Sequence, residues 1–165
     1  MKKTLLAAAL LAGFAGAASA QSSVTLYGLI DMGIGYQTVN GGTDAQNQTH
    51  FGMYNGVQNG SRWGLRGVED MGNGNRATFV LESGFDSANG TSGQAGRLFG
   101  RQSWLGIENN SWGYVRMGRQ YNFASAYVTP FDPFLAGFGT ANMGQSFGAM
   151  NTTRYSNMLK YQTPT

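Results

Sequence analysis

Hydrophobic and polar residues alternate along residues 24–36. Aliphatic side chains such as Leu26 and Ile34 fall on one parity, and Asp31 falls on the other. Because successive side chains of a β-strand point to opposite faces of its sheet, this period of two predicts a strand with one apolar and one polar face. In a soluble protein the apolar face would cover a core, whereas in a membrane barrel it would contact lipid.

Five later segments are also expected to be strands. In the first two, apolar side chains on one parity alternate with charged ones on the other, as Trp63 does with Arg62; in the third, Arg101 lies opposite Trp104. We assign Trp63 and Trp104 to the apolar face. The chain is therefore expected to form about six strands that share one polar face. The five segments are residues 61–70, 76–86, 97–107, 114–120 and 154–162.

Long and short connections alternate between these strands. Residues 37–60 and 87–96 are rich in Gly, Asn, Thr and Ser and are expected to be long polar loops. Residues 71–74 and 108–113 carry the Asn and Gly of tight turns. Outer-membrane barrels place long loops at one end and short turns at the other, so the alternation favours a transmembrane antiparallel β-barrel over a soluble β-sandwich.

The alternation is absent from residues 121–150, which contain Pro130, Pro133, several Phe and many Gly. Connections of this length without regular structure are usually functional loops or disordered, and the aromatic residues favour a functional loop.

Residues 1–20 have the pattern of a signal peptide. Lys2 and Lys3 precede an apolar stretch, and residues 18–20 read Ala-Ser-Ala, as a signal peptidase site requires. A retained membrane anchor is the alternative, but the stretch is short for a span. The mature chain, residues 21–165, is expected to begin at Gln21 and to be exported.

Composition excludes several functional classes. Glycine accounts for 26 of 165 residues and cysteine for none, so neither a disulfide framework nor a thiolate metal site is expected. Without Lys2 and Lys3, nine basic residues face eight acidic ones, a balance that does not indicate nucleic-acid binding. The single histidine, His50, lies in a polar loop, and no nucleophile–base pair is visible in the sequence, so we expect no catalytic site, no metal and no cofactor.

Five ordered blocks of sequence resemble successive strands of the general-diffusion porins of Gram-negative bacteria, particularly those of neisserial and β-proteobacterial outer membranes. The blocks are VTLYGLIDMGIGY, SRWGLRGVEDMGNGNRATFVLESGF, GRQSWLGI, YVRMGRQYN and RYSNMLKYQTP. The resemblance implies a sixteen-stranded barrel in the complete protein, assembly as a homotrimer in the outer membrane, and a third loop, here residues 121–150, folded inward as a constriction.

The resemblance also implies a function and a set of pore-lining residues. The complete protein would form a water-filled channel for passive diffusion of small hydrophilic solutes and ions. Its alternatives are a small structural or adhesive barrel with a packed interior, or a barrel enzyme. Arginines outnumber acids in the implied set, which suggests a weak preference for anions. The implied residues are Arg62, Arg66, Arg101, Arg154, Glu82, Asp31 and Asp132.

The sequence departs from the family pattern in two ways. The inward loop carries a single acid, Asp132, so its negative wall is sparse. About six strands cannot close a barrel, because open sheet edges would remain unsatisfied in lipid, and we therefore expect a partial sequence.

If the apolar face contacts lipid, some aromatic residues are candidates for the girdles at the membrane interfaces, with ordinary packing as the alternative. These residues are Trp63, Trp104, Tyr36 and Tyr114.

Overall fold

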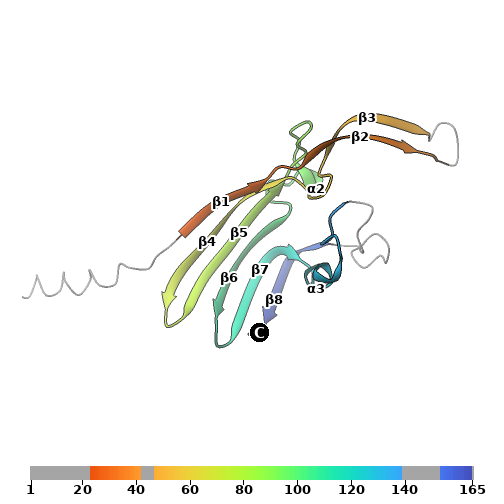
Figure 1. Cartoon of the computed structure of the whole chain (residues 1–165). Coiled ribbons are helices and arrows are strands. Elements are labelled where there is room, and N and C mark those ends of the chain that lie inside the picture. The colour runs from red at the N-terminus through yellow and green to blue at the C-terminus, as the bar shows by residue number, and fades with distance from the viewer. Residues whose placement is uncertain (1–22, 42–46, 139–152, 165) are drawn as a thin grey trace, which may run out of the picture.

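The computed structural model describes residues 23–41, 47–138 and 153–164. The predicted signal peptide and residues 139–150 of the expected inward loop lie outside these ranges. Figure 1 shows a curved wall of strands, with a helix against its last two strands and a separate hairpin beyond its first strand. None of the helices in the described ranges is long and apolar enough to span a bilayer.

The wall is a six-stranded antiparallel sheet with strand order β1-β4-β5-β6-β7-β8. Six of the eight strands in the described ranges therefore correspond to the six expected from sequence. Their bounds are β1 Ser23–Leu29, β4 Arg62–Gly72, β5 Asn75–Gly84, β6 Gln102–Asn109, β7 Gly113–Tyr121 and β8 Arg154–Gln162.

The expected loop at residues 37–60 is wrong, because most of it forms a hairpin. β2, Met32–Val39, pairs antiparallel with β3, Gln48–Asn55, and extends away from the wall (Figure 1). The segment expected as one strand therefore divides near Asp31: its first half pairs with β4 and its second half with β3. β3 was not predicted because its polar residues outnumber its apolar ones. Phe51 and Met53 nevertheless keep the period of two that is typical of a strand.

The remaining long connections contain short helical segments. α2, Gly93–Gly96, follows β5, and Gln94 and Ala95 within it have positive φ. After β7 come α3, Phe123–Val128, and the 3₁₀ turn η2, Thr129–Phe131. The short turns β4–β5 and β6–β7 lie at one end of the wall and the long connections lie at the other, as the sequence predicted (Figure 1).

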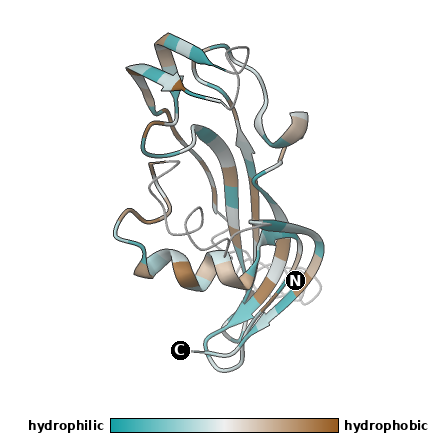
Figure 2. Cartoon of the chain, turned by 90° about the vertical axis from the view of Figure 1, so that its right-hand side faces the viewer, coloured by the Kyte–Doolittle hydropathy of each residue, from teal (hydrophilic) through white to brown (hydrophobic). Residues whose placement is uncertain are grey.

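The wall has two chemically distinct faces. One apolar row crosses it through Phe79, Leu105, Met117 and Leu159, which are paired in register. Within the described ranges no hydrophobic residue is fully buried, and Leu159 is 70% exposed. Brown and teal positions follow one another along the strands in Figure 2. In the described ranges, the apolar face of the sheet therefore covers no hydrophobic core of the kind found in soluble proteins. An exposed apolar face is the pattern of a wall that contacts lipid.

One expected orientation is wrong. Trp104 lies on the polar face, paired with Val80 and Gly118, and its ring contacts Arg116. The sequence assignment took Arg101 as part of the strand and used it to mark the polar parity, which put Trp104 on the apolar one. β6 begins only at Gln102, so Arg101 does not mark the parity of the strand. Trp63 does lie on the apolar face, whereas Tyr114 lies on the polar face, hydrogen-bonded to Gln162.

The two faces predict opposite responses to an added charge. Leu26 and Thr25 are neighbours in β1 and point to opposite faces, Leu26 towards Leu65 and Thr25 towards Arg66. We expect Leu26→Arg to destabilise the folded barrel by about 2 kcal/mol, because a cation on the lipid face loses its hydration. Thr25→Lys should cost less than half of that. Urea titration of the complete protein in detergent or lipid measures both, and equal losses would contradict the assignment of the faces.

Candidate pore wall

Glu82 is the centre of a buried ionic group on the polar face. Its Oε1 accepts a hydrogen bond from Nε of Arg101 at 2.7 Å, and its Oε2 accepts one from the Tyr27 hydroxyl at 3.0 Å. The Glu82 side chain is buried, with 7% exposed, and the Arg101 side chain is 11% exposed. A buried carboxylate is tolerated only when it is paired and hydrogen-bonded, and here both oxygens have donors.

Tyr121 joins a second arginine to this group. Its hydroxyl accepts hydrogen bonds from Nη2 of Arg101 at 3.0 Å and from Nη2 of Arg154 at 2.8 Å. The guanidinium of Arg154 also lies over the Tyr121 ring, 4.4 Å from its centroid. We call Glu82, Arg101, Tyr121 and Arg154 the arginine cluster. The cluster holds two guanidinium groups and one carboxylate, which pairs with Arg101, so the cluster carries a net positive charge.

The other two predicted arginines lie on the same face of β4. Arg62 is paired with Leu29 and Gly84, and Arg66 with Thr25 and Val80. The Arg66 guanidinium lies 5.6 Å from the centroid of the Tyr27 ring. The structure thus brings all four predicted arginines and Glu82 onto one face of the wall. Residues 62 and 66 of β4 share this face with residues 101 and 154 only because the strands pair in this register.

Asp31 lies apart from the arginine cluster, at the base of the β2–β3 hairpin. Its Oδ2 accepts hydrogen bonds from the amides of Asn59 at 2.6 Å and Gln58 at 3.0 Å. These amides, that of Asn59 first, hold the pKa of the Asp31 carboxyl below its usual value against the opposing effect of desolvation. The main-chain oxygen of Asp31 accepts from the hydroxyls of Ser61 and Ser87. These contacts fasten the hairpin to the rim of the wall.

Asp132 lies at the end of η2 and is 3% exposed. Its Oδ1 accepts a hydrogen bond from the amide of Phe134 at 2.9 Å, and its own amide donates to the carbonyl of Thr129. The acid of the expected inward loop is therefore part of a local turn. Its predicted pore-lining role stays a prediction.

A second group of polar-face residues was missed by the sequence analysis. Arg116 of β7 lies between two rings, 4.0 Å from the centroid of Tyr114 and 4.4 Å from that of Trp104. One Nη of Arg116 also lies 3.5 Å from Glu108, which is held by Arg76 as well. The alternation of YVRMGRQY was visible in sequence, but only the pairing of β6 with β7 shows that Arg116 meets Trp104.

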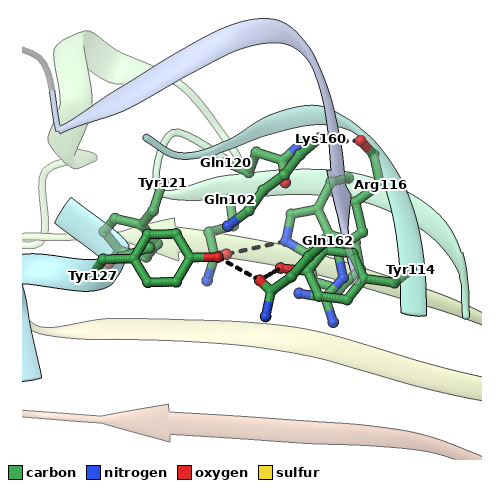
Figure 3. A pocket seen from close by; sticks show the side chains of 10 residues that line it. Gln102, Tyr114, Arg116, Gln120, Tyr121, Tyr127, Lys160 and Gln162 are labelled. Carbon is green, nitrogen blue, oxygen red and sulfur yellow. Dashed lines mark hydrogen bonds between the residues drawn. The ribbon is translucent and has the colours of Figure 1, made fainter. Parts of the chain in front are cut away.

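Arg116 and Lys160 line a pocket between the wall and α3 (Figure 3). No acidic side chain is among the ten residues that form it. Gln162 at its edge accepts hydrogen bonds from the hydroxyls of Tyr127 and Tyr114. In the part of the chain that the structure describes, no three His, Cys, Asp or Glu side chains are placed to hold a metal ion.

Comparison with known proteins agrees with this arrangement. A family model described as Gram-negative porin matches residues 7–165. The chain is 62% identical to an outer membrane porin protein of Bordetella pertussis, covering 99% of this chain and 45% of that protein. It is 39% identical to outer membrane porin protein 32 of Delftia acidovorans, covering 99% of this chain and 46% of that protein. The chain thus spans about half the length of these relatives.

A solved structure shares the fold. The anion-selective porin from Comamonas acidovorans superposes with a TM-score of 0.72 at 32% identity, over 88% of this chain and 43% of that one. The six-stranded sheet therefore corresponds to part of a porin β-barrel, and its apolar face to the lipid-facing side. A family match over nearly the whole chain, relatives named for the outer membrane and a shared fold together show that this chain belongs to the Gram-negative porins of the outer membrane.

Proposed function

We propose that the complete protein forms a water-filled channel through which small hydrophilic solutes and ions diffuse passively, without catalysis or cofactor. The observation that supports this most directly is the two-faced wall: its apolar face is exposed, and its opposite face carries arginine side chains. A barrel closed from such strands encloses a polar interior. The relatives named as porins support the same function, and homotrimeric assembly is proposed on the family resemblance alone.

We further propose that the channel prefers anions weakly. The polar face carries Arg62, Arg66, Arg101 and Arg154, and Glu82 neutralises only part of their charge. Charged side chains that line a narrow pore lower the cost of entry for ions of opposite sign. The solved relative is itself described as anion-selective. In this proposal α3 and η2 belong to the segment that narrows the pore.

Reversal potentials in planar bilayers test both parts of this proposal. In a tenfold KCl gradient, the complete protein should conduct and should show a reversal potential of the sign expected for anion preference. The double variant Arg62→Gln/Arg66→Gln should lower the anion-to-cation permeability ratio by about twofold or more, because two lumenal charges within a Debye length of the ion path are lost.

Arg97→Gln is the matched control, since Arg97 follows α2 in a connecting loop, where its Nη1 donates to the Gln94 carbonyl. It should change the permeability ratio less than the double variant. Cation preference in the unmodified protein would reject the anion hypothesis. A correctly folded protein without any conductance would instead indicate a barrel with a packed interior.

A further inference from the structure

Lys160 of β8 is a buried cation surrounded by aromatic rings. Its side chain is on the polar face, and only 7% of the residue is exposed. Nζ lies 5.1 Å from the ring centroid of Phe123, 5.5 Å from that of Tyr127 and 5.9 Å from that of Tyr114. Its interactions within the described ranges are with these rings, and none is with a carboxylate. A cation over aromatic faces is attracted by their quadrupoles, more strongly as water is excluded.

Two of the three rings belong to α3, the helix that follows β7. Phe123 and Tyr127 are one helical turn apart and stack with ring centroids 6.1 Å apart and planes 7° apart. Both therefore present ring surface to the same lysine. Tyr127 also donates a hydrogen bond from its hydroxyl to Oε1 of Gln162 at 2.8 Å. Residues 160 and 162 of β8, which share the polar face, thus hold the same side of α3 (Figure 3).

α3 depends on such contacts because it has only six residues. A helix this short is not stable in isolation, so its position must come from capping and tertiary contacts. Its first turn is capped by Asn122, whose side chain accepts a hydrogen bond from the Ser125 amide at 2.6 Å. The Asn122 amide donates to the carbonyl of Thr153 at 3.0 Å, which fixes the start of the helix. Beyond this start, Lys160 and Gln162 of the wall contact the helix through Phe123 and Tyr127.

We propose that Lys160 is a positioning residue that fastens α3 to the barrel wall through the rings of Phe123 and Tyr127, and so keeps the segment formed by α3 and η2 against the polar face. This rests on the proposed channel function, in which that segment sets the width of the pore. The lysine acts here through its contact with α3, a role separate from any attraction it exerts on ions in transit.

Hydrogen exchange in the complete protein tests the attachment without reference to transport. Lys160→Met keeps a long side chain and removes the cation, whereas Phe123→Leu removes the nearest ring and leaves every charge in place. Each should accelerate exchange of the amides of residues 123–131 by about tenfold, the loss expected for a desolvated cation–π contact. The combined variant should accelerate exchange little beyond either one alone, because both remove the same contact. Lys160→Arg should retain most of the protection.

Phe131→Leu is the matched control, since Phe131 is 80% exposed and outside the set of rings around Lys160. It should leave the exchange of α3 unchanged. The proposal is overturned if Lys160→Met and Phe123→Leu leave exchange unchanged, or if Lys160→Met alone accelerates it, since the lysine would then act through its charge and not through the rings.

Single-channel recording connects the attachment to the pore. We expect Phe123→Leu to increase open-channel current noise and to alter conductance while the reversal potential keeps its value, because no charge has changed. If the unmodified protein does not conduct at all, the channel function fails, and the exchange experiment still decides whether Lys160 holds α3.

Discussion

Replacing Glu82 by glutamine is expected to destabilise the folded protein by about 3 kcal/mol and, in the same variant, to increase its preference for anions. The carboxylate is 7% exposed and pairs with Arg101, so neutralising it leaves a buried guanidinium without its counter-charge. The hydroxyl of Tyr27 loses a charged acceptor in the same change. With the carboxylate gone, the positive charge of Arg101 and Arg154 is no longer offset on the polar face.

Two measurements on the complete protein check this expectation. Denaturant titration measures the free energy of unfolding, and the reversal potential in a KCl gradient measures the ion preference. Glu69→Gln is the control: Glu69 is an exposed acid on β4, and within the described residues it has no ion pair. It should leave the reversal potential unchanged, because Glu69 shares the apolar face with Leu65 and does not face the pore. A shift of the Glu82 variant toward cations would refute the role assigned to the arginine cluster.

Gly118→Ala should prevent normal assembly of the barrel wall or destabilise it by more than about 3 kcal/mol. Gly118 has φ +127° beside a shift in the register between β7 and β8, a backbone conformation that residues with a Cβ rarely adopt. A Cβ there would overlap the carbonyl oxygen of Ser103 and lie 2.9 Å from Cα of Trp104, both in the neighbouring strand β6. Relief of this overlap would push β6 and β7 apart.

Gly90→Ala separates the cost of the positive φ from the cost of the overlap with β6. Gly90 also has positive φ, at +79°, but a Cβ there would meet nothing within 4 Å. Its substitution should cost only the conformational term of about 1 kcal/mol. Yield of the heat-modifiable folded form and urea midpoints of the two variants give the comparison. If the two variants lost equal stability, the close approach of β6 to Gly118 would not contribute to the effect of Gly118→Ala.

The strands of the wall could be predicted from sequence because each is encoded locally. A period of two in residues 61–70 or 154–162 needs no knowledge of neighbours, and Asn73-Gly74 marks the β4–β5 turn by its own backbone preference. The error at Trp104 has an equally local cause. Parity can be counted only within an unbroken strand, and the bend at Arg101 precedes the first residue of β6.

The β2–β3 hairpin shows the limit of composition. Its residues keep a period of two, but Thr38 and Thr49 stand on the face of Ile34 and Met53, where Val and Leu stand in the wall, and Gln37 and His50 lie on the other face. Composition alone therefore indicated a loop. What makes the segment a hairpin is cross-strand pairing, such as Ile34 with Met53 and Tyr36 with Phe51.

The candidate site was predictable as a list of residues and not as an arrangement. Alternation and family resemblance placed Arg62, Arg66, Arg101 and Arg154 on the polar side, where the structure also has them. Neither could show that Tyr121 bridges two arginines or that Lys160 is surrounded by rings from α3. The two hydrogen bonds to Tyr121 join residues 20 and 33 positions apart in sequence, so a local pattern of residues cannot predict them.

By itself, the sequence determined that this protein forms antiparallel strands with one lipid-compatible face and one polar face, joined by alternating long and short connections. Side-chain periodicity and turn chemistry are properties of the local backbone, so they could be recognised without a structure. The tertiary structure decided which charges meet: Glu82 with Arg101, Arg116 with Trp104, and Lys160 with α3. The physical reason is that strand register and the path of the chain after β7 set these distances, and both result from the packing of the whole sheet.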